Sequence, residues 1–261
     1  MVSFIAILKK EALEAWRTHK IIILAAVAVI LAVMSVLLAK LTPEILRSLT
    51  ANDEMIGIAF EIPDPTAWDS WTQFFGNVGQ LGMMAVIIVF GGIMANELKH
   101  GTLINLLTKG VQRVTIILAK FVSASALWTL TYAICICVNA GYTAYYFETV
   151  SMEHALLSFA ALWLFGEFLI AVAIFAGTLF KSFIGALLTS LLLAFTMSIL
   201  TINPDFDRYN PITLCAKNMQ LLQGFSSADD VTVVIVCMCI TAGAVIVMIA
   251  GAIAVFSKQQ V

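Results

Sequence analysis

The sequence has 261 residues, of which 61% are hydrophobic and 11% are charged, and its net charge is −2 at pH 7. A soluble domain carries roughly 45 to 50% apolar and about 25% charged residues, so this composition excludes an ordinary soluble enzyme or binding module. The mean hydropathy of +1.00 and the long unbroken apolar runs predict an all-α integral membrane protein, because a membrane barrel strand would alternate in polarity.

Residues 1–20 precede the first long apolar run and carry an amphipathic pattern. Apolar side chains recur near one helical face at Phe4, Leu8, Ala12, Ala15 and Trp16. Such a pattern, with basic residues on the remaining surface, is typical of a helix that lies in the membrane interface. We therefore predict an N-terminal amphipathic helix here, and a frayed cytoplasmic tail is the less favoured alternative.

Six runs are long and apolar enough to cross a hydrocarbon core of about 30 Å, which takes on the order of 20 helical residues. They lie at about 21–41, 79–96, 119–146, 154–180, 182–202 and 231–256. Lysine and arginine gather before the first run, after the second and fourth, and at the end of the chain. The positive-inside rule then places both termini in the cytoplasm, and we expect residues 1–261 to form one multi-pass domain in a bacterial-type plasma (inner) membrane.

Two segments predicted on the outer side are longer than simple hairpins. Residues 42–78 end in an aromatic group that suits the headgroup level: Trp68, Trp71, Phe74 and Phe75. Residues 203–230 contain their own helix signal. Asn210 suits the cap, Pro211 the first turn and Gly224 the stop, which predicts a short external helix. The glycines that open the second run are interpreted as sites of close helix packing: Gly76, Gly79 and Gly82.

The segment 97–118 is a polar, basic interruption between the second and third runs. Charged side chains here and just beyond are expected to face water: Glu97, Lys99, His100, Lys109, Arg113 and Lys120. Leu103, Leu106 and Leu107 recur at helical spacing, which predicts a short amphipathic helix. The interpretation is that this helix docks on a partner, and the alternative is a loop that only sorts charge.

The motifs of an ATP-hydrolysing or metal-dependent enzyme are absent from the sequence. No Gly-Lys dipeptide occurs, so the phosphate-binding loop of nucleotide hydrolases is missing. His19, His100 and His154 are far apart, and neither a His-Glu-x-x-His nor a Cys-x-x-Cys spacing is present. The chain is therefore not expected to be an enzyme by itself, and no metal or cofactor site is predicted in it.

Glu167 is an ionisable residue near the middle of the fourth run. An uncompensated carboxylate at that depth costs about 2.5 to 3.5 kcal/mol or more, so Glu167 must face protein or water, or be protonated. One interpretation is a polar contact in a substrate pathway or a proton-sensitive group. The other is a structural hydrogen bond to a neighbouring span.

The loop after the second run resembles the conserved cytoplasmic loop of ATP-binding-cassette (ABC) type-2 permeases. That loop has an acidic residue, Gly-Thr-Leu, Leu-Leu, a turn with Arg, and then Lys. The matching residues here are Glu97, Gly101, Thr102, Leu103, Leu106, Leu107, Thr108, Arg113 and Lys120. The amphipathic first helix, the six spans and the helical excursion before the last span agree with the same family. Gly110 departs from the pattern, because the family often has proline there.

The resemblance implies that residues 97–118 form a coupling helix that enters a groove on a separate ATPase subunit. Its contact residues would be Glu97, Lys99, His100, Gly101, Thr102, Leu103, Leu106, Leu107 and Arg113. Two ATPase subunits would bind ATP and Mg, and no cofactor is expected in this chain. A second permease chain, identical or related, would complete the pathway within membrane lipid, with no nucleic-acid partner.

The small size of the chain and its apolar outer segments suggest an exporter of an amphiphile such as a peptide, antibiotic, drug or lipid-like molecule. We expect spans one, two and five to form the pathway wall. An ion-coupled secondary transporter is the alternative, but it would need several intramembrane ionisable groups and only Glu167 qualifies. A non-transporting membrane assembly protein is a further alternative, and each alternative predicts that no ATPase partner exists.

Overall fold

The computed structural model describes all residues except 1, 51–62, 203–205, 207, 225–226 and 260–261. The described elements are helical, which confirms the all-α membrane fold. Among the described residues, six helical segments are long and apolar enough to span a membrane: Lys20–Ser48, Ala67–Lys99, Arg113–Tyr146, Ala155–Phe180, Phe183–Leu200 and Asp229–Lys258. They overlap the six predicted runs, and the first two extend well into the predicted outer segment 42–78.

The first two helices, α1 (Val2–Arg17) and α2 (Lys20–Thr50), meet at a corner where His19 adopts a positive φ of 60°. The face of α1 that packs on the bundle carries Ile7, Glu11 and Ala15, which are buried. Trp16 is 65% exposed, so it does not share this face with Ala15 as predicted. Neighbouring residues point about 100° apart on a helix. Since the face with Ala15 packs on the bundle, the side chain of Trp16 points away from it.

The second span consists of α3 (Ala67–Asn77), a π-helical turn η1 (Val78–Gly82) and α4 (Met83–Lys99). It begins at Ala67 with a capping box between Thr66 and Asp69. Three members of the aromatic group predicted for the headgroup level pack into the core. Trp71, Phe74 and Phe75 are buried and pack around the ring of Phe159, at centroid distances of 5.4, 6.2 and 5.6 Å. Their i, i+3, i+4 spacing makes one apolar helix face, which packing on the fourth span buries.

The remaining described helices complete a bundle around the fourth span. They are α5 (Ile104–Thr108), α6 (Arg113–Tyr146), α7 (Ala155–Phe180), α8 (Phe183–Leu200), α10 (Thr213–Ala216), α11 (Asn218–Leu222) and α12 (Ala228–Lys258). In the most apolar 18-residue stretch of α7, 72% of the residues are buried, because α4, α6, α8 and α12 all pack against this helix. In α8 the share is only 11%, so α8 lies at the edge of the bundle.

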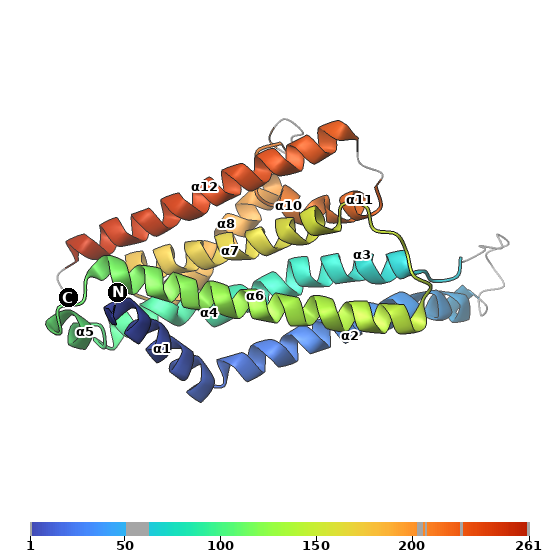
Figure 1. Cartoon of the computed structure of the whole chain (residues 1–261). Coiled ribbons are helices and arrows are strands. Elements are labelled where there is room, and N and C mark those ends of the chain that lie inside the picture. Colours follow the sequence, from blue (N-terminus) through green and yellow to red (C-terminus); the bar gives the residue numbers. More distant parts are fainter. Residues whose placement is uncertain (1, 51–62, 203–205, 207, 225–226, 260–261) are drawn as a thin grey trace.

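Both chain termini, α1 and α5 lie at the same end of the bundle (Figure 1). The short helix α11 lies toward the other end and contacts α3, and α10 lies beside it. This arrangement matches an even number of spans. It also places the basic loop after span two beside the two termini, as the charge pattern predicts.

Candidate functional site

The segment between spans two and three folds into the short helix α5, with a glycine turn on either side. The turn at Gly101 ends α4, and the turn at Gly110 ends α5. At Gly101, φ is +68°, and the amide of Thr102 donates to the carbonyl of Glu97 at 3.2 Å. At Gly110, φ is +79°, and the amide of Val111 donates to the carbonyl of Leu106 at 3.2 Å. Both are Schellman motifs, which favour glycine because they need a left-handed residue. Proline cannot adopt a positive φ, so this chain closes α5 differently from a loop with proline at that position.

One side of α5 is fastened to the bundle and the other faces outward. Leu103 is fully buried, and Leu106 and Leu107 pack against the core. The exposed side chains of this segment include Lys99, His100, Thr102, Ile104, Thr108 and Lys109. Of the nine predicted contact residues, Lys99, His100 and Thr102 are therefore exposed. The three leucines hold α5 in place, and Gly101 shapes the turn before it.

Glu97 and Lys120 do not face water as predicted, because they belong to an ion cluster between α1, α4 and α6. Lys120 is 1% exposed, and its Nζ lies 3.1 Å from Oε1 of Glu11 and 2.9 Å from Oε2 of Glu97. Lys10 also contacts Glu97 and lies 3.1 Å from Glu11 and 3.0 Å from Glu14. Glu97 is only 12% exposed, so most of its surface already contacts this chain.

The cluster is balanced in charge, with Lys10, Lys20 and Lys120 against the three glutamates. Burial alone would lower the pKa of Lys10, but its contacts with Glu97, Glu11 and Glu14 outweigh burial and raise that pKa above its ordinary range. The carboxylates of Glu11, Glu14 and Glu97 lie within 4.8 Å of one another, a spacing that could suit a cation. Because lysine ammonium groups contact all three, the arrangement serves as a link between helices rather than as a metal site.

Arg113 points to the end of the last span. Its Nη1 donates to the carbonyls of Phe256, Ser257 and Gln259 at 2.5, 3.0 and 2.7 Å. A cation at a helix C-terminus is favourable, because it satisfies free carbonyls and the negative end of the helix dipole. Arg113 therefore caps α12 and joins the start of span three to the end of span six.

Replacing Arg113 with alanine should loosen the end of α12 while leaving the bundle folded. Hydrogen bonds to charged groups contribute about 1.5 to 3 kcal/mol, and the loss here is local to the last turn. Hydrogen exchange should therefore become faster at 254–259 and stay unchanged in α7. The Arg113→Lys variant keeps the positive charge but lacks the planar guanidinium group with its several donors, and should recover part of the protection from exchange. Equal protection in the alanine variant would show that the cap contributes nothing.

Glu167 faces α6, where its Oε1 accepts a hydrogen bond from the hydroxyl of Ser125 at 2.7 Å. The side chain is 3% exposed, and its Oε2 has no hydrogen-bond partner among the described residues. Phe165 and Leu169, on the opposite face of α7, line a cavity that Glu167 does not reach. This geometry favours the structural interpretation of Glu167 over a pathway contact.

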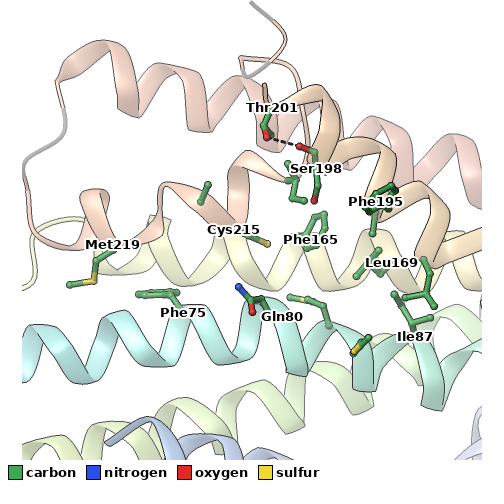
Figure 2. A pocket seen from close by; sticks show the side chains of 18 of the residues that line it. Phe75, Gln80, Ile87, Phe165, Leu169, Phe195, Ser198, Thr201, Cys215 and Met219 are labelled. Carbon is green, nitrogen blue, oxygen red and sulfur yellow. Dashed lines mark hydrogen bonds between the residues drawn. The ribbon is translucent and has the colours of Figure 1, made fainter. Parts of the chain in front are cut away.

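That cavity is open, has a volume of about 640 Å³ and lies between spans two, four and five (Figure 2). Its wall includes residues of α3, η1, α4, α7, α8, α10 and α11. The π-helical turn presents Gly79 and Gln80 to it, and π-turns inside helices are frequent at functional sites. A Cβ added at Gly76 would meet no described atom within 4 Å, so Gly76 borders open space and not a close helix contact as predicted.

Spans two and five line this cavity, as expected of a pathway wall, whereas the described part of span one contributes no residue. The fourth span and α10 also line the cavity, through residues such as Phe165 and Cys215. Sequence reasoning missed them because an apolar run that is hydrophobic all round shows no direction. The sequence held one signal of the cavity itself, in span two, where Gln80 and two glycines interrupt the start of the apolar run.

The chain matches the sequence pattern described as ABC-2 family transporter protein over residues 5–261. It is also similar to the uncharacterized transmembrane protein YxlG of Bacillus subtilis (strain 168), with 26% identity over 238 residues and 88% of each chain covered.

Proposed function

The chain belongs to the ABC-2 family of transporter proteins and is a multi-pass membrane permease component, and we propose that it serves an ATP-driven exporter of amphiphilic molecules. A separate ATPase subunit in two copies would bind ATP and Mg, and a second permease chain would complete the assembly. The plasma membrane is the expected location, with both termini cytoplasmic. The observation that carries the proposal is the short helix α5, which faces outward beside both termini, is held to the core by Leu103 and lies directly between spans two and three in the chain.

The coupling element in this proposal is α5, with an outer face for the ATPase and an inner face for the bundle. Lys99, His100 and Lys109 are the exposed basic or ionisable groups of the outer face. Leu103 fixes α5 to the core, and α4 and α6 continue directly from its two turns. A displacement of α5 would therefore move spans two and three, while Glu97 and Arg113 carry it to α1 and α12.

The cavity is the proposed substrate chamber. It is bounded by span two, whose last part, α4, leads directly into α5. It is also bounded by α8, at the edge of the bundle. Tilting span two against spans four and five would change its width, which is what alternating access requires. An ion-coupled mechanism has less support, because the carboxylate of Glu167 faces Ser125 of α6 and not the cavity.

Reversing two charges on the outer face of α5 tests the coupling role. The Lys99→Glu and Lys109→Glu double variant should weaken binding of the ATPase subunit by about tenfold or more, because groups that attract the two native lysines would repel glutamates. The measurement is copurification from native membranes, followed by titration of the isolated ATPase against the chain in nanodiscs.

Lys258→Glu is the matched control, because Lys258 is also exposed and lies at the end of the last span. It should leave ATPase binding unchanged. Unchanged affinity in the double variant would contradict the role of α5. The absence of any copurifying ATPase would contradict the proposed function itself.

A further inference from the structure

The cavity between spans two, four and five has a polar part and an apolar part. Thr72 and Gln80 lie on the half of span two that is distant from α5, and Ser198 and Thr201 lie at the corresponding end of span five. Figure 2 shows Gln80 on one wall and Ser198 with Thr201 on the wall across from it. These polar groups thus lie in the half of the cavity nearer to the start of α3, where Phe75 and Met219 also line the wall.

The other half of the cavity, toward the middle of the bundle, is apolar. Its lining residues there are Met83, Met84, Ile87, Leu169 and Leu191. Along span two the wall runs from Thr72 to Ile87, which corresponds to roughly 22 Å at 1.5 Å per residue. A ligand that fills this space is elongated, with its hydrogen-bonding group near Gln80 and its apolar body near Ile87.

None of the described residues that line the cavity is aspartate, glutamate, lysine, arginine or histidine. An ionic group buried there would lose its hydration without gaining a counter-charge, at a cost of several kcal/mol. The amide of Gln80 and the hydroxyl of Ser198 can instead donate to and accept from neutral groups, and the hydroxyl of Thr72, which donates to the carbonyl of Trp68, can still accept. Glu167 is two residues before the lining residue Leu169 on α7, but its side chain faces Ser125 of α6 and not the cavity.

We infer that this cavity binds an uncharged amphiphile, with a neutral hydroxyl- or amide-bearing head toward Gln80, Ser198 and Thr201 and an apolar tail toward Ile87 and Leu191. This inference rests on the proposed function for its meaning in transport, but binding does not require the ATPase. The site selects against charge in the head group and tolerates variation in the tail, whose wall is apolar.

Three photoreactive probes with the same octyl tail test the inference. Each carries a diazirine near the end of the tail, and the heads are glucoside, trimethylammonium and sulfate. With the whole chain in lipid nanodiscs, the glucoside probe should label peptides containing Ile87, Leu169 or Leu191. Unlabelled octyl glucoside should compete, and the two charged probes should label these peptides at least about tenfold less.

Two variants make the head-group contact testable. Gln80→Glu should reverse the preference toward the trimethylammonium probe, because it places a carboxylate at the polar end. Gln73→Glu is the matched control, since Gln73 lies on the same span, in α3, and does not line the cavity. Ser198→Asp tests the opposite wall and provides a second position if Gln80→Glu folds poorly.

Equal labelling of the cavity by all three probes would overturn the inference, and so would labelling confined to the outer surface of α8. The result is separate from the test of coupling. Selective labelling without any ATPase partner would leave the binding site intact and contradict the exporter. An ATPase partner with unselective labelling would leave the exporter intact and contradict the selectivity.

Discussion

Replacing Lys120 with methionine is expected to destabilise the protein by about 3 to 5 kcal/mol, the usual cost of removing one partner of a buried ion pair. Lys120 is almost fully buried, and its ammonium group joins Glu11 of α1 to Glu97 of α4. Without it, two mostly buried carboxylates on different helices remain close together with only Lys10 between them. Their repulsion should also detach α1 from the bundle.

Thermal unfolding in nanodiscs measures this effect, and Lys99→Met is the control, because Lys99 lies at the same end but is exposed. The control should change stability by no more than a surface substitution does, within about 0.5 kcal/mol. Adding Glu97→Gln to Lys120→Met should restore part of the loss, because it removes one of the two unpaired charges. If the Lys120 and Lys99 variants were equally stable, the cluster would not hold α1.

Replacing Gly166 with alanine should have a comparably large effect, through steric overlap. A Cβ at this position would lie 2.5 Å from Nε1 and 2.6 Å from Cζ2 of Trp128, well inside van der Waals contact. The indole cannot move aside freely. Its Nε1 donates to the carbonyl of Trp163 at 3.0 Å, and its ring stacks on Tyr132 at 5.3 Å. Overpacking in a close-packed core typically costs about 1 to 3 kcal/mol, and the fixed indole places Gly166→Ala at the upper end.

Gly141→Ala is the matched control, because a Cβ at Gly141 meets no atom within 4 Å in the described structure. It should be neutral or stabilise by up to about 1 kcal/mol, since glycine inside a helix is unfavourable. Trp128→Leu in the Gly166→Ala background should relieve the overlap and recover part of the loss. Equal unfolding temperatures for the Gly166 and Gly141 variants would show that α6 and α7 can separate at no cost.

Much of the fold was predictable from local patterns. The six spans follow from apolar runs of sufficient length, and α5 follows from the period of Leu103, Leu106 and Leu107. The start of span two was not predictable, because aromatic residues are common both at the membrane interface and in buried packing. Only contact with Phe159 on α7 shows that Trp71 and Phe74 belong to the core.

The candidate site was predictable in position but not in the direction of its side chains. Glu97 and Arg113 belong to the loop that sequence reasoning selected, yet both are engaged within the chain. Their partners, Lys10 and the carbonyl of Phe256, come from opposite ends of the sequence. No local pattern connects such distant residues, so a charged residue in a basic loop is naturally interpreted as facing water.

By itself, the sequence determined the class of the protein, the number of its spans, the place of its short helix and the lack of a nucleotide-binding motif. These properties depend on hydropathy, helical period and residue identity, which are local. Only the tertiary structure decided that Lys120 is buried, that Glu167 turns toward Ser125 and that span four lines the cavity. The physical reason is that a helix that is apolar all round can pack with any of its faces inward, and its neighbours choose which.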